Sequence, residues 1–487
     1  MLKKIALGAL ALVAGLVVVL IARTLALPPA AKGAAKPAFD AASADSAAMA
    51  ARLGEAIRFE TISWGDEREP DAAAFEGFAA FLERAYPAAH AAMTRETIAG
   101  HSLLYRWKGE GTGQPIAFLA HIDVVPVEPG TEDGWTHPPF DGAVADGAVW
   151  GRGALDDKGP LIALMEAAER LAASRFRPQA DIYFLFGHDE ELGGFAGAGE
   201  MRKVLDARGV RFAFTLDEGS GLVQGLIPGV APPVALISTA EKGSTTLKVT
   251  ATTEGGHSSA PGKDTAVSLV SRAVVAMTDE PYPLEVDENV VAFLHAIAPQ
   301  TPFFERAALA NIWLTGPIIA RRLGENPATA ASLRTTTAAT IISGGVKENV
   351  LPQTASAYVN HRIHPRDSVE GVRLRAQSIV NDERVKVETL NGVEPTPQSP
   401  ATGSGYEAIK AATLDMFGPV PIAPSLTIGG TDSRHYVGAA DGNYRFTPFV
   451  FTPDDLARLH GTDERLKIAD LVRAVAWYEA LIRKAAG

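Results

Sequence analysis

Cysteine is absent from the whole chain of 487 residues. This absence excludes a disulfide framework, a thiolate metal site and a cysteine nucleophile. Any metal ion held by side chains must therefore be bound by histidine, aspartate or glutamate. The absence of cysteine does not discriminate between oxidising and reducing compartments.

Excess positive charge is also lacking, since 45 Lys and Arg residues face 57 Asp and Glu residues, giving a formal net charge of -12. A protein that binds a phosphate backbone needs a basic surface, so nucleic acid is not expected as a partner. Hydrophobic residues make up 47% of the chain and charged residues 21%. Such a chain can bury a large core and is predicted to be globular, with more than one domain.

One long hydrophobic run stands at the N-terminus. Two lysines precede an uncharged apolar stretch over residues 5–22, which is just long enough to cross a bilayer as a helix. Residues 1–27 are interpreted as a membrane anchor, with a cleaved signal segment and secretion as the alternative. The positive-inside rule keeps the lysines inside and exports the catalytic part to the periplasmic or extracellular side. Residues 28–42, rich in proline and alanine, are predicted to be a linker.

Strand and helix patterns alternate after the linker. The chain runs through an apolar strand, an amphipathic helix and two further apolar strands: "PIAFLAHIDVVP", "GPLIALMEAAERLAAS", "DIYFLF" and "RFAFTL". This order favours a largely parallel α/β sheet, whose active site lies beyond the carboxyl ends of the strands. The ends of these strands carry His121 and Asp123, then Glu190 and Glu191, and finally Asp217.

Carboxylates are crowded at these strand ends, above all in "GHDEELGG". An isolated acidic run would be interpreted as a solvated loop at the start of a helix, but convergence of several strand ends indicates a bound cation. Asp156 and Asp157 lie in a loop between two of the strands. Histidine and carboxylate ligands suit zinc or a similar divalent ion, and two ions would relieve the crowding. Asp123, two residues after His121, can orient its imidazole.

Seven motifs in order resemble a known family: "AHIDVVP", "WGRGALDDKG", "GHDEELGG", "LDEG", "GGHSSAP", "VKENVLP" and "LHGTDER". They resemble the di-zinc peptidase and amidohydrolase family that includes carboxypeptidase S, aminoacylase, carnosinase and glutamate carboxypeptidase. The resemblance covers about residues 50–485. The segment from "NIWLTG" to "NHRIHP" is most similar to carboxypeptidase S and to the secreted N-fatty-acyl-amino-acid synthase/hydrolase.

The resemblance implies two Zn²⁺ ions, or other divalent ions, with Asp156 bridging them. In the family pattern, one ion takes His121 and Asp217, and the other takes Glu191 and His460. Glu190, which directly precedes the ligand Glu191, is implied as the general base for the attacking water. A cis peptide bond after the bridging aspartate, between residues 156 and 157, is implied as well.

The resemblance also implies the fold and its division. The expected fold is a mostly parallel α/β catalytic domain, in residues 43–238 and 391–487, with an inserted α+β lid domain in residues 239–390. A helical stretch within the lid, residues 289–334, is richly apolar. Two interpretations of this stretch stay open: packing on the lid, or an apolar entrance for a long acyl chain.

Three residues are expected at the substrate. The resemblance places Asn349 and Arg362 there, and an arginine can grip a carboxylate in two places. Arg434, in "GGTDSRHY", is a second candidate for that carboxylate, and a strand-surface arginine is the alternative for Arg362. His257 would ordinarily be satisfied by its neighbouring serines, but the resemblance implies that it stabilises the oxyanion, in dimeric relatives across a lid-mediated interface. The resemblance thus implies a homodimer through the lid. The alternative is a monomer whose lid closes in cis, with the stretch of residues 289–334 covering that surface.

The expected activity is metal-dependent hydrolysis of an amide bond next to a free amino-acid carboxylate. The substrate would be a small peptide or an N-acyl amino acid, so the enzyme would be a carboxypeptidase or an N-acyl-amino-acid hydrolase. One alternative is an aminopeptidase or dipeptidase of the same family, which would need an acid for the substrate amine. The other is a non-catalytic binding protein on this fold.

Overall fold

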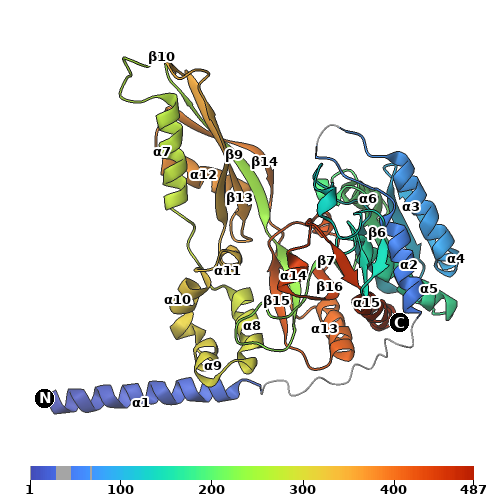
Figure 1. The fold of residues 1–487 in the computed structure, drawn as a ribbon. Coiled ribbons are helices and arrows are strands. Elements are labelled where there is room, and N and C mark those ends of the chain that lie inside the picture. Colours follow the sequence, from blue (N-terminus) through green and yellow to red (C-terminus); the bar gives the residue numbers. More distant parts are fainter. Residues whose placement is uncertain (1, 29–44, 66–67) are drawn as a thin grey trace.

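A computed structural model describes residues 2–28, 45–65 and 68–487 (Figure 1). Its largest unit is an eight-stranded sheet with the order β1-β2-β6-β3-β7-β16-β8-β15. The strands are β1 (Thr94–Ile98), β2 (Ser102–Trp107), β3 (Gly113–His121), β6 (Ala180–Gly187), β7 (Phe214–Val223), β8 (Val234–Glu241), β15 (Ile422–Thr427) and β16 (Asn443–Phe451). Strands β6, β3, β7 and β16 run parallel to one another, and β8 runs parallel to β15. The predicted α/β class with a largely parallel sheet is confirmed.

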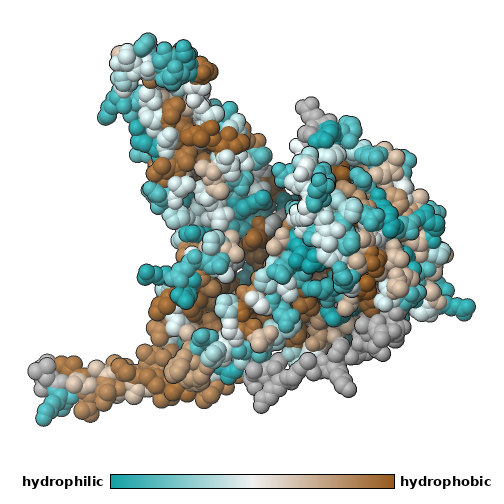
Figure 2. Space-filling view, in the orientation of Figure 1, coloured by the Kyte–Doolittle hydropathy of each residue, from teal (hydrophilic) through white to brown (hydrophobic). Residues whose placement is uncertain are grey.

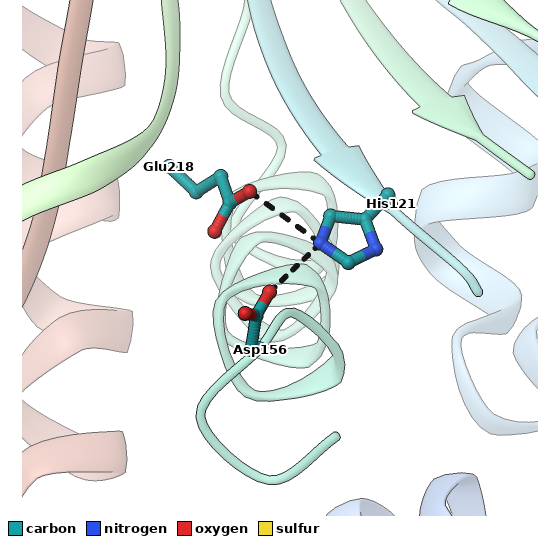
Figure 3. Close-up of side chains that lie close together, drawn as sticks. All are labelled: His121, Asp156 and Glu218. Carbon is teal, nitrogen blue, oxygen red and sulfur yellow. Dashed lines mark hydrogen bonds and ion pairs between the residues drawn. The ribbon is translucent and has the colours of Figure 1, made fainter. Parts of the chain in front are cut away.

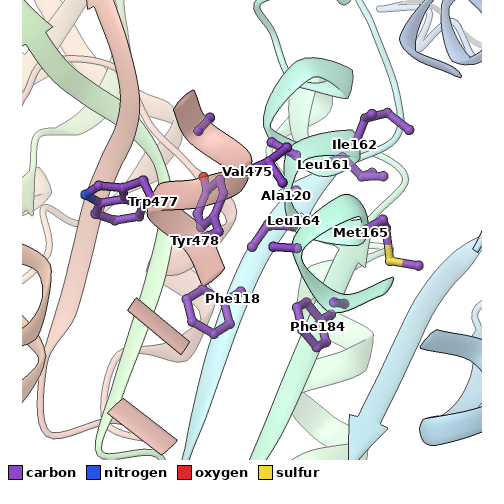
Figure 4. Packing of buried hydrophobic residues seen from close by; sticks show 14 of the residues in the cluster. Phe118, Ala120, Leu161, Ile162, Leu164, Met165, Phe184, Val475, Trp477 and Tyr478 are labelled. Carbon is purple, nitrogen blue, oxygen red and sulfur yellow. The ribbon is translucent and has the colours of Figure 1, made fainter. Parts of the chain in front are cut away.

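Both faces of this sheet are covered by helices, which explains its uninterrupted apolar strands. Alternate residues of β3 enter different clusters: Phe118 and Ala120 face the larger core, while Ala117 and Leu119 face the smaller one. The larger core packs against α5 and α15, as Figure 4 shows around Phe118. The helices on the two faces are α2 (Ser46–Ile57), α3 (Ala72–Ala85), α4 (Pro87–Ala92), α5 (Lys158–Ala173), α6 (Ala198–Ala207), α13 (Ser404–Phe417) and α15 (Ile468–Ala486).

A second unit, which we call the lid, has its own antiparallel sheet and its own core. Its strand order is β11-β13-β9-β14, and α7 and α12 pack against the sheet. The short strands β10 and β12 pair at the far end of the lid (Figure 1). The lid elements are β9 (Gly243–Thr252), β10 (Gly256–His257), α7 (Ala266–Asp279), β11 (Thr336–Gly344), β12 (Val350–Leu351), β13 (Thr354–Ile363), α12 (Val369–Val380) and β14 (Val385–Val393).

Four helices between lid elements form what we call the helical insert: α8 (Glu288–Ile297), α9 (Phe303–Ala310), α10 (Ile312–Leu323) and α11 (Pro327–Ala331). Packing on the lid is not what the structure shows for the apolar residues of α8. Leu294 and Ile297 join a cluster with Val230 and Val234, and α8 packs on β15 at the edge of the large sheet. The reason is that β15 is an edge strand, whose apolar surface needs a cover.

One helix among the described residues, at the N-terminus, is long and apolar enough to cross a membrane. It is α1 (Leu2–Ala26), which extends away from the rest of the molecule (Figure 1). Of the predicted linker, residues 29–42 lie outside the described residues. A small sheet of β4 (Ala143–Ala145), β5 (Ala148–Trp150) and β17 (Arg465–Lys467), and the short helix α14 (Pro453–Leu456), complete the fold.

Candidate metal centre and substrate cavity

The carboxyl end of β3 fixes the imidazole of His121. This buried ring donates from Nδ1 to the backbone carbonyl of Asp123, at 2.9 Å, which leaves Nε2 to face the other side. The carboxylate of Asp123 accepts bonds from the Ser63 hydroxyl and from the backbone N–H groups of Glu190 and Glu191. Asp123 therefore ties the end of β3 to the acidic turn after β6.

Two groups of possible metal ligands meet at this edge of the sheet. The first consists of His121, Asp156 and Glu218 (Figure 3), and the second of Asp156, Glu191 and His460. Within each group, one ligand atom per residue lies within 4.8 Å of the others. Asp156 belongs to both groups, as expected for a bridging carboxylate. The peptide bond that follows it, between Asp156 and Asp157, is cis, as the resemblance implied.

Glu218, which the sequence reasoning missed, stands where Asp217 was expected. Glu218 Oε1 lies 3.4 Å from His121 Nε2. The buried carboxylate of Asp217 turns away and accepts the backbone N–H of Ser433 at 2.6 Å and that of Glu218 at 2.9 Å. Neighbouring residues of a strand point to opposite sides, so only one acid of "LDEG" can face the centre. The motif itself holds no signal that decides which one.

The charge balance of the cluster fits a cation. Burial and the nearby charge of Asp156 raise the pKa of Glu218 to about 8. Burial likewise raises the pKa of Glu190 well above its usual range, with the acids around it adding to the rise. The adjacent carboxylates of Asp156 and Glu191 raise the pKa of His460 to about 10. Glu218 and Glu190 thus hold their protons more tightly because they are buried and lie among other acids, and a divalent ion would replace those protons.

A buried oxygen of Glu191 that lacks a hydrogen-bond partner among the described residues also indicates a bound cation. Glu191 Oε1 is buried and has no hydrogen-bond partner of good geometry among the described residues, with His460 Nε2 at 3.3 Å. The pKa of Asp156, although burial opposes this, is held well below its usual range by hydrogen bonds from His121 and His460. An ionised carboxylate between two imidazoles, in an all-N and O donor set, suits zinc. The residues present therefore fit a divalent metal.

A cavity of about 790 Å³ opens beside these groups. One wall carries the acidic cluster, including Glu190, Glu191 and His460, and the other is formed by the lid. Arg362, on β13, lines the lid wall, and no acidic side chain among the described residues pairs with it. Arg434 also lines the cavity, but its guanidinium is bonded to the buried carboxylate of Glu241 at 3.1 Å.

Two expected site residues, the oxyanion residue His257 and the substrate residue Asn349, lie away from this cavity. His257 is in β10 at the far end of the lid, where its Nδ1 accepts the backbone N–H of Ser259 (Figure 1). Asn349 is close by, because its carbonyl accepts the backbone N–H of Ser258. Both side chains are exposed. Within one chain, therefore, the structure brings Arg362 and Arg434 to the cavity and leaves His257 and Asn349 outside it.

Comparisons with known proteins place this site in a family. The sequence pattern of the peptidase family M20/M25/M40 matches residues 117–484, which include every candidate ligand. The chain belongs to this family. A probable carboxypeptidase S-like 2 from Dictyostelium discoideum is 39% identical over 444 residues, covering 89% of this chain and 84% of that one. The N-fatty-acyl-amino acid synthase/hydrolase PM20D1 of Xenopus tropicalis is 37% identical over 445 residues, covering 88% and 84%.

The fold of this M20 peptidase agrees with that assignment. A metallo-carboxypeptidase of the M20 family from Sulfolobus solfataricus superimposes with a TM-score of 0.63 at 17% identity, covering 90% of this chain and 99% of that one. The family, the relatives and the two candidate ligand groups together make the protein a metal-dependent hydrolase of amide bonds. The expectation of a hydrolytic enzyme is thereby confirmed over a non-catalytic binding protein.

Proposed function

We propose that this M20 peptidase releases amino acids from N-acyl amino acids or from the carboxyl ends of small peptides, using two zinc ions. Asp156 would bridge the ions, with His121 and Glu218 on one and Glu191 and His460 on the other. When bound, such ions polarise the amide carbonyl and lower the pKa of water. Glu218 thereby takes the position first expected for Asp217.

The residues of the chain supply the remaining chemistry. Glu190 lines the cavity beside both ligand groups, so we assign it the proton of the attacking water, which it then delivers to the leaving amine. Its neighbour Glu191 faces the second ligand group. Residues adjacent in a turn point apart, which lets one act as base and the other as ligand.

The observation that carries the substrate assignment is the unpaired Arg362 on the lid wall, across the cavity from the acidic cluster. A guanidinium there can bind the carboxylate of an amino acid whose acyl bond faces the base. No acid belongs to the lid residues that line this cavity, among those described, which disfavours recognition of a free amine by the lid. The carboxylate of Glu241 partly neutralises Arg434, so Arg362 is the better anchor.

Hydrolysis of seven matched compounds tests this assignment. We expect cleavage of an N-acetyl amino acid, an N-oleoyl amino acid and an N-acetyl dipeptide, each with a free carboxylate. The same three compounds with an amidated carboxylate should be poor substrates. A dipeptide with a free amine and an amidated carboxylate is the seventh compound, and its preferential cleavage would show an aminopeptidase and reject the proposal.

We propose further that α1 is retained as a membrane anchor and that the catalytic part is exported. Its length, its uncharged apolar run and the lysines before it support this, as for a signal anchor.

His257 and Asn349 lie outside the cavity of their own chain, so we propose that they serve the cavity of a second copy, through a homodimer formed by the lids.

A further inference from the structure

The helical insert presents apolar side chains to the outside, which is the reverse of an ordinary surface helix. We call this set the apolar face: Phe303, Phe304, Trp313, Leu314 and Ile318. Phe304 is 86% exposed and Ile318 is 72% exposed. On α10, Leu314 and Ile318 lie opposite the buried residues Ile312, Gly316 and Ala320. Trp313 borders the buried side and lines a hollow with them. Packing against the protein therefore already uses one side of α10 and leaves the apolar face without a partner among the described residues.

The last turns of α1 are bonded to this insert. Arg23 Nε donates to the carbonyl of Ala310 at 3.4 Å, and Asn311 Nδ2 donates to the carbonyl of Leu20 at 3.2 Å. Asn311 Nδ2 also lies 3.5 Å from the hydroxyl of Thr24, which is buried. Figure 2 shows that the hydrophobic surface of α1 continues onto the adjoining helices. The end of α1 and the apolar face are therefore parts of one surface.

We propose that the apolar face docks into the outer interface of the bilayer that α1 crosses. This inference rests on the proposed anchor role of α1. A helix that leaves a bilayer at Arg23 brings any structure bonded to that point to the level of the lipid headgroups. Tryptophan and phenylalanine are favoured at this level, where an amphipathic helix can lie in the plane of the interface.

Charge on α10 agrees with a lipid surface as the occupant. Arg321 and Arg322 are exposed and follow Ile318 by about one turn. Basic side chains at the edge of an apolar helix face suit phosphate headgroups, and their long stems reach from the apolar layer to the phosphates. A hollow of about 660 Å³ beside α10 also has apolar walls from Val286, Val291 and Ile312, and Arg23 is among its lining residues.

Docking would hold the substrate cavity at a fixed height above the lipids. An N-acyl amino acid with a long chain partitions into a bilayer, so its amide would be presented near the enzyme without leaving the membrane. The apolar residues of the insert would then act on the supply of lipid-borne substrate, not on the chemistry. Short, water-soluble substrates should be indifferent to this surface.

Single cysteines test the proposal cleanly, because the natural chain has none. The full-length protein carrying Phe303→Cys, Phe304→Cys or Ile318→Cys is labelled with an environment-sensitive fluorophore and reconstituted into phosphatidylcholine and phosphatidylglycerol vesicles. The matched control is Val144→Cys on β4, because Val144 and Phe303 are both 51% exposed. We expect blue-shifted emission, quenching by brominated lipids and several-fold weaker quenching by iodide at the three insert positions only.

Equal iodide quenching at the insert positions and at the control would overturn the proposal. Protection that grows with protein density, without quenching by brominated lipids, would show a second copy as the occupant and would also overturn it. The mass of the reconstituted chain reports whether α1 is retained. Hydrolysis of an N-acetyl amino acid by the same vesicles reports the proposed activity separately, so failure of the activity and failure of the docking are distinguishable.

Discussion

His460 and Asp156, far apart in the sequence, meet at the candidate metal centre with 3.0 Å between Nε2 of the histidine and Oδ2 of the aspartate. The other oxygen of Asp156 lies 2.9 Å from Nε2 of His121. One carboxylate therefore joins two ligand groups, and the second group brings His460 from the last part of the chain to residues of the first part. This relationship is the basis of the two-ion proposal, and the predictions below examine the residues around it.

The base and the ligand in the acidic turn should be separable by mutation. Glu190→Gln should keep the bound metal but lower turnover about 10³-fold, because a general base is lost while the ligands stay. Glu191→Gln, its neighbour and matched control, should lower the metal content itself. Metal analysis and turnover are measured on the same samples. Near-normal turnover of Glu190→Gln would reject its role as base.

The assignment of Glu218, and not Asp217, as a metal ligand can be tested by a pair of amide variants. Glu218→Gln removes a charged metal ligand near His121 and should reduce the metal content. Asp217→Asn keeps an oxygen that can accept the backbone N–H of Ser433, so it should retain the metal. Binding of zinc is measured by titration calorimetry on both variants. Loss of metal from Asp217→Asn alone would restore the original expectation.

The substrate carboxylate should depend on Arg362. Arg362→Ala should weaken binding of carboxylate-bearing substrates by about 2 to 4 kcal/mol, since a charge partner is removed from the cavity. Amidated analogues should lose little. The comparison variant is Arg434→Ala, where the loss should include stability, because Glu241 then keeps Arg445 as its one charge partner among the described residues. Inhibition constants for both classes of ligand measure the effect, and equal losses for the two classes would mark Arg362 as structural.

Without metal, the protein should become less stable as the pH rises. The pKa of Glu218 is raised from 4.5 to about 8 in the folded state, so the folded protein holds more protons than the unfolded chain between these values. The free energy of unfolding therefore falls as the pH rises through this window. Urea unfolding at pH 5, 7 and 8.5 measures the free energy of unfolding. Glu218→Gln is the control, in which this free energy should depend less steeply on pH. A flat or rising stability of the metal-free enzyme would contradict the charge balance described above.

If His257 acts in the cavity of a second copy, mixing two inactive variants should restore activity. Glu190→Gln and His257→Ala are each expected to be inactive, but a mixed dimer contains one cavity with both native residues. Subunit exchange is verified with two affinity tags, and turnover is measured after exchange. No recovery from exchanged subunits would reject action across the dimer, and full activity of His257→Ala alone would reject the role.

Local sequence patterns predicted the frame of the site well. The apolar run "DIYFLF" lies in β6, and the helical spacing after residue 158 corresponds to α5. Both segments could be predicted because helical periodicity and the apolar composition of a strand are properties of residues close together in the chain. His121, Asp156 and Glu191 could be placed because each lies at the end of a strand, just after one, or in a motif between two strands, at one edge of the sheet.

Features that depend on distant contacts could not be predicted in this way. The choice between Asp217 and Glu218 depends on which side of β7 faces the centre, and Asp217 is held on the other side by the backbone N–H of Ser433, which is distant in the sequence. Placing His257 at the far end of the lid required the pairing of β10 with β12. Cover of the sheet edge by the helical insert depends on α8 meeting β15, which no local pattern encodes.

Zinc titration of the metal-free enzyme tests the central claim most directly. The metal content and the hydrolysis of an N-acyl amino acid are followed together in the native protein and in Asp156→Asn. The two-ion account predicts that activity returns as two zinc ions bind per chain, and that Asp156→Asn neither retains both ions nor regains activity. Full activity with one ion or none, or an Asp156→Asn variant that binds two ions and hydrolyses the substrate normally, would contradict it.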